Sequence, residues 1–281
     1  MMKIMTTIKT TKLLFQPLLF VLTLVFTLIT PAIAQEEGIL DSPWKFHVNL
    51  YGWLPEAPAT ITRNDKVLAD VPEDLDTILE SMDATAMFEL EAHKGPLVLF
   101  LNNVYYKGEY NDHFIGKESK QRRKFTFEEE VWAVKYGAGY KLDPIKLGDK
   151  PDSADVTLIP WVGAFYFHDD WETKVSAAPP FDGVDVDGTL EFNTPMVGLG
   201  SRWNLSKNWY LNLSYGQGGW DVDDVDEIYD ILGNFVYRFK MGDVSSKFIA
   251  GYRYLHIDYD DGTMEVDVDV KGPFLGFGWE F

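Results

Sequence analysis

The chain has 281 residues, a formal net charge of −19 at pH 7, and Phe, Trp or Tyr at 15% of its positions. This acidity argues against nucleic-acid binding, because proteins that bind a phosphate backbone carry basic surfaces. The chain contains no cysteine, so its stability does not depend on disulfide bonds. The length is compatible with one large all-β domain.

The N-terminus has the order of features typical of a secretory signal peptide. Three lysines precede a largely apolar run from Leu13 to Ile29, and Ala32 and Ala34 occupy the −3 and −1 positions of a cleavage site. An uncleaved anchor helix is the alternative, and the polar residues after Ala34 disfavour it. We therefore expect residues 1–34 to be removed, leaving residues 35–281. No later stretch reaches the roughly 18 apolar residues of a membrane-spanning helix.

Alternation at period two marks the first strand of the mature chain. One face is bulky and apolar and the other polar: Trp44, Phe46, Val48 and Leu50 alternate with Lys45, His47, Asn49 and Tyr51. Residues 55–83 follow as a long loop, in which 59–63 and 66–69 predict a small hairpin. From Pro72 to Met82, apolar residues recur at helical spacing and predict a short amphipathic helix in this first loop.

Similar segments continue to the end of the chain and predict nine further strands. They lie at 84–93, 97–110, 125–140, 155–167, a segment ending in 196–205, 209–216, 228–239, 247–259, and a last strand ending at Phe281. The connections after the first, third, fifth and seventh strands are long or charged, and those after the second, sixth and eighth are tight. A linker after the fourth strand and a tight turn before the tenth depart from this pattern. Outer-membrane β-barrels have long loops outside and short turns in the periplasm.

The last strand carries the clearest pattern. Leu275, Phe277, Trp279 and Phe281 share one face, and the opposite face is mostly glycine with Glu280. A chain that stops on Phe after such a strand resembles the C-terminal strand of bacterial outer-membrane barrels, where this strand carries the signal read by the assembly machinery. A core strand of a secreted β-sandwich is the alternative, and it gives no reason for the alternation of loop lengths.

These observations predict an all-β fold: a transmembrane antiparallel up-and-down β-barrel of about ten strands, with eight or twelve as alternatives. An even strand number places both termini in the periplasm. One conflict remains in the last strand, because Glu265, Asp267 and Asp269 share the parity of the lipid-facing aromatics. Either the residues before Lys271 rise past the bilayer, or a bulge at Gly272–Pro273 switches the faces. We favour the first interpretation.

Several motifs resemble those of a widespread group of Gram-negative outer-membrane β-barrel proteins. They are Tyr51-Gly-Trp-Leu-Pro55, Asp74-Leu-Asp76, Glu91 with Lys94-Gly95-Pro96, Gly251-Tyr-Arg253-Tyr254 and Gly272-Pro273. The resemblance spans the mature chain and implies its fold and an outer-membrane location. It implies no activity, catalytic residue or cofactor. The expected partners are outer-membrane lipid, lipopolysaccharide, the barrel assembly machinery and periplasmic chaperones.

Once the apolar faces are assigned to lipid, charged residues of both signs remain for the lumen. They are Lys45, His47, Glu89, Glu91, Lys135, Arg202, Asp230, Arg238, Arg253 and Glu280. A ten-stranded barrel is narrow, and isolated charges inside it are costly. We therefore expect a network of ion pairs that closes the lumen, in which the three arginines pair with the carboxylates. The alternative is the lining of a pore or a functional site.

An enzymatic interpretation would rest on histidines and acids near the extracellular strand ends. Candidates are His113, His168-Asp169-Asp170, and His256 with Asp258, Asp260 and Asp261, because a histidine can activate a water that an acid orients. The sequence shows no serine-centred elbow and no zinc-ligand spacing. We therefore expect a structural or surface-interaction barrel without a cofactor or metal. A small-solute channel and a surface hydrolase with a rim His/Asp site are the alternatives.

Two loops carry charge clusters with open interpretations. Lys117, Lys120, Arg122, Arg123 and Lys124 either contact lipopolysaccharide phosphates or form a solvated basic loop. The acids from Asp221 to Asp226, and those from Asp182 to Asp187, offer oxygen ligands for Ca²⁺. They lack the glycine and glutamate of an EF-hand loop, so we expect weak divalent binding at most.

Overall fold

The computed structural model describes residues 42–56, 59–63, 66–71, 82–115, 122–149, 153–176 and 183–281. The predicted signal peptide and residues 72–81 of the predicted helix lie outside these ranges, and Met82 begins a strand. Every described strand belongs to the unit Trp44–Phe281. No helix that is long and apolar enough to cross a bilayer occurs among the described residues.

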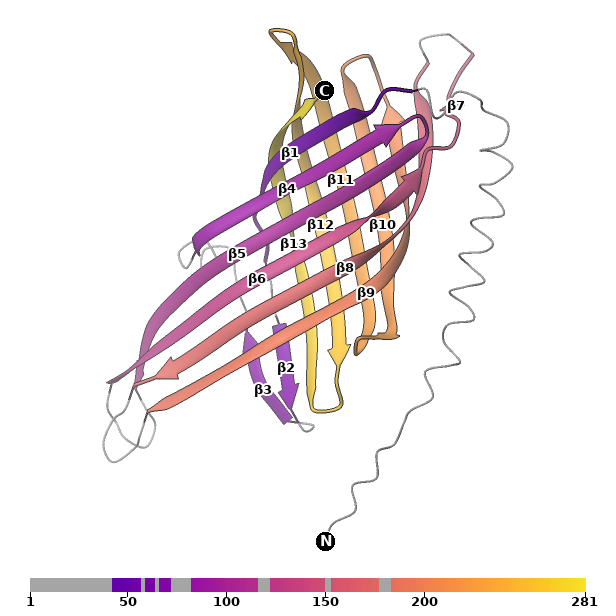
Figure 1. Cartoon of the computed structure of the whole chain (residues 1–281). Coiled ribbons are helices and arrows are strands. Elements are labelled where there is room, and N and C mark those ends of the chain that lie inside the picture. Colours follow the sequence, from indigo (N-terminus) through magenta and orange to yellow (C-terminus); the bar gives the residue numbers. More distant parts are fainter. Residues whose placement is uncertain are drawn as a thin grey trace. The chain divides into compact units, whose positions relative to one another are not determined.

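Ten long strands form one closed antiparallel sheet (Figure 1). They are β1 (Lys45–Trp53), β4 (Met82–Lys94), β5 (Leu97–Ile115), β6 (Arg122–Tyr140), β8 (Asp155–Val175), β9 (Val184–Asn204), β10 (Trp209–Val222), β11 (Val225–Met241), β12 (Val244–Asp260) and β13 (Met264–Glu280). Each pairs with the next, and β13 pairs back onto β1 from His47↔Glu280 to Trp53↔Phe274. The predicted all-β up-and-down barrel of ten strands is confirmed.

Three short strands accompany the barrel. The predicted hairpin in the first loop is present as β2 (Ala59–Arg63) and β3 (Lys66–Val71), and a two-residue strand β7 (Ile145–Lys146) pairs with β8. Strand β2 pairs with the first half of β13, beyond the point where β1 stops. It therefore continues the path of β1 along β13 and does not raise the number of barrel strands to twelve.

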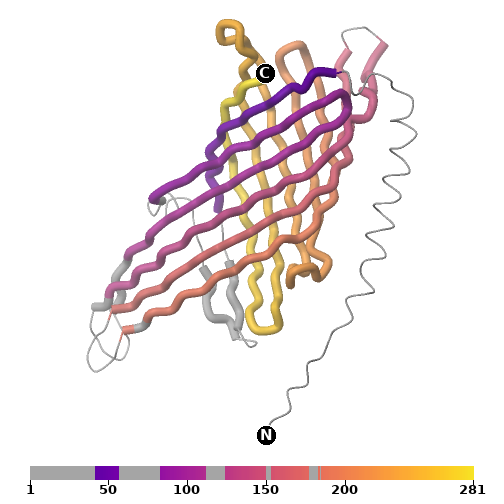
Figure 2. Tube along the Cα trace, viewed as in Figure 1, coloured from indigo at the N-terminus to yellow at the C-terminus, as the bar shows by residue number. Residues whose placement is uncertain are grey.

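The two ends of the barrel differ in their connections (Figure 2). Phe281, the start of β1 and the turns β4–β5, β9–β10 and β11–β12 lie at what we call the terminal end. The opposite end, which we call the loop end, carries the connections β5–β6, β8–β9, β10–β11 and β12–β13.

One loop-end connection corrects the sequence analysis. The acidic segment Asp221–Asp226 was expected to form a loop, but β10 and β11 pair as far as Val222↔Val225 and leave a two-residue turn. Asp223 and Asp224 have φ of 54° and 62°. A tight hairpin of this kind requires positive φ at both central residues, and Asp tolerates that conformation better than most residues.

The outer face near the terminal end is apolar and aromatic. Leu275 is 67% exposed and Phe235 and Phe248 are each 55% exposed, values that would be unusual for large apolar side chains on a soluble surface. Ring pairs such as Trp209–Tyr237, at 4.8 Å between centroids, cover the outer surface near the terminal end. Tyr105–Trp132 and Tyr215–Tyr229 lie further toward the loop end on the same face. An apolar band flanked by aromatic side chains is the outer surface of a transmembrane barrel.

Strand β13 keeps one parity along its whole length. Its register with β12 runs from Ser245↔Glu280 to Asp260↔Glu265 without a shift, so a bulge that switches faces at Gly272–Pro273 is absent. Val266 packs inward against the core while Glu265 on the outer face is exposed. The acidic residues therefore lie on the same outer face as the aromatic residues, further along the strand toward the loop end.

Candidate functional site in the barrel lumen

A buried ion cluster crosses the middle of the lumen. Asp230 on β11 has no exposed surface, and its carboxylate accepts hydrogen bonds from Lys135 on β6 and Arg253 on β12. Arg253 donates from Nε to Oδ1 at 2.8 Å and from Nη2 to Oδ2 at 3.2 Å, which is the bidentate arrangement favoured by guanidinium. Strands β6 and β11 are not neighbours in the sheet, so the Lys135–Asp230 contact bridges the lumen.

Arg253 also contacts polar and aromatic groups besides Asp230. Its Nη1 donates to Asn102 Oδ1 at 3.1 Å, and the same oxygen accepts from the Tyr51 hydroxyl at 3.0 Å. The guanidinium lies 5.1 Å from the centre of the Trp53 ring, whose Nε1 donates to the Gly272 carbonyl. A buried charge is tolerated when it is hydrogen-bonded, and here each of the three guanidinium nitrogens donates to a partner.

Trp161 fills the lumen beside the ion cluster. The Lys135 ammonium lies 5.5 Å from its ring centre, and Phe100 meets the indole edge to face at 5.4 Å. A Cβ at Gly198 or Gly216 would lie only 2.3 or 2.7 Å from indole atoms. The indole therefore packs against two glycines, which supply the space that a large ring needs inside a narrow barrel.

Closer to the terminal end, His47, Glu91 and His93 gather on β1 and β4, with their ligand atoms within 4.8 Å of one another. His93 Nε2 donates to Glu91 Oε2 at 2.8 Å, while Lys141 Nζ donates to His93 Nδ1 at 2.7 Å. Lys247 Nζ lies 3.4 Å from His47 Nδ1. Histidine and carboxylate are metal-ligand types. Two ammonium groups already contact these rings and would repel a metal ion, so we assign the cluster to hydrogen bonding.

Glu89 and Glu280 also have polar partners near the terminal end of the lumen, whereas Lys45 has none there among the described residues. Glu89 accepts from Asn49 Nδ2 at 2.8 Å. Glu280 lies 3.9 Å from the Lys247 ammonium and accepts from the Ser245 hydroxyl at 3.3 Å. Lys45 was expected in the lumen, but its side chain is exposed at the start of β1 and forms no ion pair with the described residues.

Arg202 and Arg238 depart from the expected pairing with carboxylates. Arg202 Nε donates to Asn212 Oδ1 at 3.1 Å, and Arg238 Nη2 donates to Asn204 Oδ1 at 3.3 Å. Both guanidiniums lie over the ring of Tyr210, at 4.8 and 4.4 Å from its centre. Among the described residues, neither arginine has a carboxylate oxygen within 4 Å.

The physical reason is their position on the barrel wall. The carboxylates Glu89, Glu91 and Glu280 project from β4 and β13, where Asn49, His93 and Lys247 contact them first. Arg202 and Arg238 project from β9 and β11 on another part of the wall. Amide oxygens and an aromatic face satisfy them there.

A second layer, built from apolar side chains, fills the lumen toward the loop end. Phe165 and Phe167 on β8 and Phe192 on β9 stack with centroid distances of 5.3–6.5 Å, and Phe192 stacks on Tyr259 of β12 at 6.0 Å. Phe165 is fully buried and Phe192 is 2% exposed. Because β9 and β12 are not neighbours, the Phe192–Tyr259 contact also bridges the lumen.

The histidines considered for catalysis lie on the outer face of the barrel. His168 contacts Asp170 at 3.0 Å and Glu191 at 3.7 Å on β8 and β9. His256 contacts Asp269 at 3.0 Å and Asp267 at 3.8 Å on β12 and β13. The two histidines share no partner. The side chain of His113 lies outside the described part of the chain, and the structure assembles no common His/Asp site from the other two.

The basic loop residues are largely outside the described structure. This applies to Lys117 and Lys120 and to the side chains of Arg122 and Arg123. Lys124 on β6 is exposed, and its backbone N–H donates to Ser176 Oγ at 2.8 Å. Contact with lipopolysaccharide at this loop stays a prediction.

The residues predicted to carry the assembly signal form one outward row on β13. Phe277 contacts the Trp279 ring at 4.9 Å and the Phe248 ring at 5.3 Å. Phe281 is 67% exposed, and its backbone exchanges two hydrogen bonds with Phe46 at 3.0 and 2.9 Å. Together with Leu275, these side chains lie at the seam where the last strand meets the first.

Comparison with known proteins supports the fold. The chain aligns with the outer membrane protease OmpT from Escherichia coli over 85% of its own length and 97% of OmpT, at 9% identity and a TM-score of 0.50. Ail, the attachment invasion locus protein of Yersinia pestis, aligns over 85% of this chain and 99% of Ail, at 9% identity and a TM-score of 0.34. No protein-family model and no curated protein sequence matches the chain.

At such identities the similarity concerns the fold alone, and of these two alignments the one with OmpT has the higher TM-score. The chain thus shares the closed β-barrel architecture of an outer-membrane protein.

Proposed function

We propose that the protein is an integral outer-membrane β-barrel with a closed lumen and a structural or surface-interaction role. The observation that carries this proposal is the double obstruction of the lumen. Lys135 and Asp230 form an ion pair across it, and Phe192 and Tyr259 stack across it closer to the loop end. Both layers consist of buried side chains from non-neighbouring strands. A diffusion pore requires a continuous water-filled passage, which two such layers oppose.

The outer face supports placement in the membrane. Exposed aromatic and aliphatic side chains encircle the terminal half, and an N-terminal signal peptide is predicted. In this proposal the terminal end and both termini of the mature chain are in the periplasm, and the loop end faces outward. The long strands fit this orientation, because β8 and β9 each have 21 residues and a membrane crossing needs roughly 9–11.

The loop half would then stand outside the bilayer as the interacting surface. Its outer face carries ion pairs between neighbouring strands, among them Lys107–Glu130 at 2.8 Å and Lys174–Glu128 at 3.7 Å. Lipopolysaccharide phosphates are the proposed contact of the basic run from Lys117 to Lys124. Periplasmic chaperones and the barrel assembly machinery are the proposed partners during insertion, with Phe281 and its outward row as the signal.

Conductance measurements test the closed lumen. The mature protein, refolded and inserted into planar bilayers, should leave the current at the level of the bare bilayer. A steady ohmic conductance would replace the proposal with the small-solute channel. Release of peptide or acyl product by the same preparation, lost in His168→Ala or His256→Ala, would replace it with the surface hydrolase.

Assembly in cells tests the placement. Deletion of Phe281 should reduce the yield of heat-modifiable outer-membrane barrel, whereas Asp243→Asn in the β11–β12 turn should not. Equal barrel yields for the deletion and the wild type would contradict the proposed signal. Recovery of the wild type as a soluble periplasmic protein from unstressed cells would contradict the membrane placement.

A further inference from the structure

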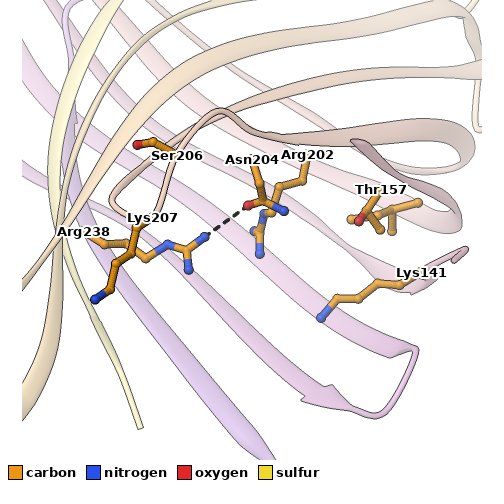
Figure 3. A pocket seen from close by; sticks show the side chains of 8 residues that line it. Lys141, Thr157, Arg202, Asn204, Ser206, Lys207 and Arg238 are labelled. Atoms are coloured by element: carbon orange, nitrogen blue, oxygen red, sulfur yellow. Dashed lines mark hydrogen bonds between the residues drawn. The ribbon is translucent and has the colours of Figure 1, made fainter. Parts of the chain in front are cut away.

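The terminal mouth of the barrel contains a basic pocket of about 370 Å³ (Figure 3). Four of its lining residues are cations and none is a carboxylate: Lys141, Arg202, Lys207 and Arg238, together with Thr157, Ile159, Asn204 and Ser206. This composition is unexpected in a chain whose net charge is −19. Four clustered cations in a partly enclosed site repel one another, and a bound anion would relieve that repulsion.

Arg202 and Arg238 are held in place by Tyr210, but few of their N–H donors have a hydrogen-bond partner. Among the described residues, each forms a side-chain hydrogen bond to only one group, an asparagine oxygen, although a guanidinium has five N–H donors. The Nε of Arg238 is buried without a hydrogen-bond partner. Contact with the same Tyr210 ring restricts the movement of both guanidiniums. Donors that are oriented and unsatisfied are the arrangement expected of an oxyanion site before it is filled.

Neighbouring groups define how an anion would lie. Glu91 and Glu280 interact electrostatically with Arg202 and Arg238 from more than 4 Å away, so they restrict an anion to the side of the pocket formed by β8, β9 and β11. The Thr157 and Ser206 hydroxyls are neutral donors on that side, and the Asn204 amide is held between Arg238 and Asp155. Lys207 and Ser206 belong to the β9–β10 turn, which opens the pocket toward the terminal end.

We propose that this pocket binds a phosphate group carried by a small molecule or a lipid headgroup, which enters from the terminal end. A phosphate presents several oxygens at the spacing of a guanidinium fork, and two arginines with two lysines match a dianion or a pyrophosphate. The volume exceeds that of phosphate alone, so the pocket also accommodates the atoms to which the phosphate is attached.

Calorimetric titration tests the proposal with the mature barrel refolded in a phosphate-free maltoside detergent at constant ionic strength. Inorganic pyrophosphate should bind saturably with one site per barrel. Arg202→Gln and Arg238→Gln should each weaken binding about tenfold or more, since a charge-assisted hydrogen bond contributes roughly that factor. Lys207 is exposed in the β9–β10 turn, so Lys207→Gln should not affect folding. It should weaken pyrophosphate binding by a smaller factor.

Lys240→Gln is the matched control, because Lys240 is exposed on the same strand as Arg238 and does not line the pocket. It should leave the affinity unchanged. Absence of saturable binding to the wild type, or equal weakening by Lys207→Gln and Lys240→Gln, would overturn the proposal. Short-chain phosphatidylglycerol distinguishes the sources: displacement of pyrophosphate by it indicates a lipid headgroup, and failure to displace indicates a soluble phosphate compound.

Discussion

The terminal and loop halves of the barrel have opposite distributions of polarity on the same strands. In the terminal half of β12, Phe248 and Tyr252 are exposed on the outer face, while Lys247 and Arg253 are buried inside. In the loop half of the same strand, Ile257 and Tyr259 are buried inside and Asp258 lies on the outer face. The alternation of inward and outward residues continues unbroken along the strand. What reverses is the type of side chain on each face.

Strand β13 shows the same reversal near Lys271. Glu265 is on the outer face before it, and Leu275 is on the outer face after it. The terminal half thus has the polarity of a membrane barrel, and the loop half has that of a soluble one, with charges outside and an apolar core. The outward apolar stretch from Lys271 to Phe281 matches the roughly 9–11 residues of a membrane-crossing strand. The reversal therefore marks one boundary of the proposed membrane.

The two halves are stabilised by different forces, and the largest predicted effect is in the polar one. Asp230→Asn removes the only carboxylate that contacts Lys135 and Arg253 within 4 Å among the described residues. Because two cations then remain buried without a counter-charge, the free energy of unfolding should fall by about 3–5 kcal/mol or more. Urea unfolding of the refolded barrel measures it. Asp243→Asn, at an exposed turn, should change it by less than about 0.5 kcal/mol.

The apolar half should respond through packing. Ile257→Ala removes a side chain that is 1% exposed and should lower the free energy of unfolding by about 2–5 kcal/mol, through lost burial and the remaining cavity. High salt should leave this loss unchanged. Val186→Ala near the start of β9, where Val186 is 45% exposed, should cost less than about 0.5 kcal/mol. Equal losses at the two positions would show that the loop half has no packed core.

The junction between the halves should tolerate little added volume. Gly198→Ala places a methyl group 2.3 Å from the Trp161 indole and from the Tyr215 carbonyl oxygen, so ring and backbone must both shift. We expect a loss of about 1–3 kcal/mol in the free energy of unfolding. Gly52→Ala is the matched control, because nothing lies within 4 Å of a Cβ at Gly52. If both substitutions cost the same, the close packing of Trp161 on Gly198 is not a determinant of stability.

Much of the barrel could be predicted from local patterns. Alternation at period two and the terminal aromatic row are properties of single strands, and they gave the correct fold and strand number. The same parity places His93 beside Glu89 and Glu91, and Lys247 beside Arg253, although neither basic residue was included in the predicted lumen. Both lie next to turns, where the end of a strand is hardest to locate from the sequence.

Contacts across the lumen could not be predicted in this way. Lys135 meets Asp230 because the shear of the closed sheet brings β6 opposite β11, and no local pattern encodes that shear. The same cause explains why the pairing expected for Arg202 and Arg238 was wrong. Opposite charge alone does not show which strands lie close enough across the lumen for their side chains to pair. The reversal of polarity was visible as a conflict in β13, and the continuous register of that strand resolves it.

The smallest predicted effect concerns the acidic tip of the β10–β11 hairpin in the loop half. Burial, a hydrogen bond with Asp221 and the negative charge of Asp258 raise the pKa of the Asp226 carboxyl above its ordinary value of 3.8. A raised folded-state pKa means that the folded tip binds a proton more readily than the unfolded chain. Stability at the tip is therefore lost as pH rises from 3.8 through the raised pKa, and is regained on acidification.

Asp226→Asn should consequently stabilise the tip at about pH 7 and have little effect below about pH 4, where the native carboxyl is already protonated. Hydrogen-exchange protection of the Asp260 amide, which donates to the Asp224 carbonyl at 2.9 Å, reports on this region. Asp243→Asn in the β11–β12 turn at the terminal end serves as the control and should leave that protection unchanged. A stabilisation by Asp226→Asn that is equal at both pH values would mean that the gain comes from the amide's own hydrogen bonds and not from relief of repulsion among the acids.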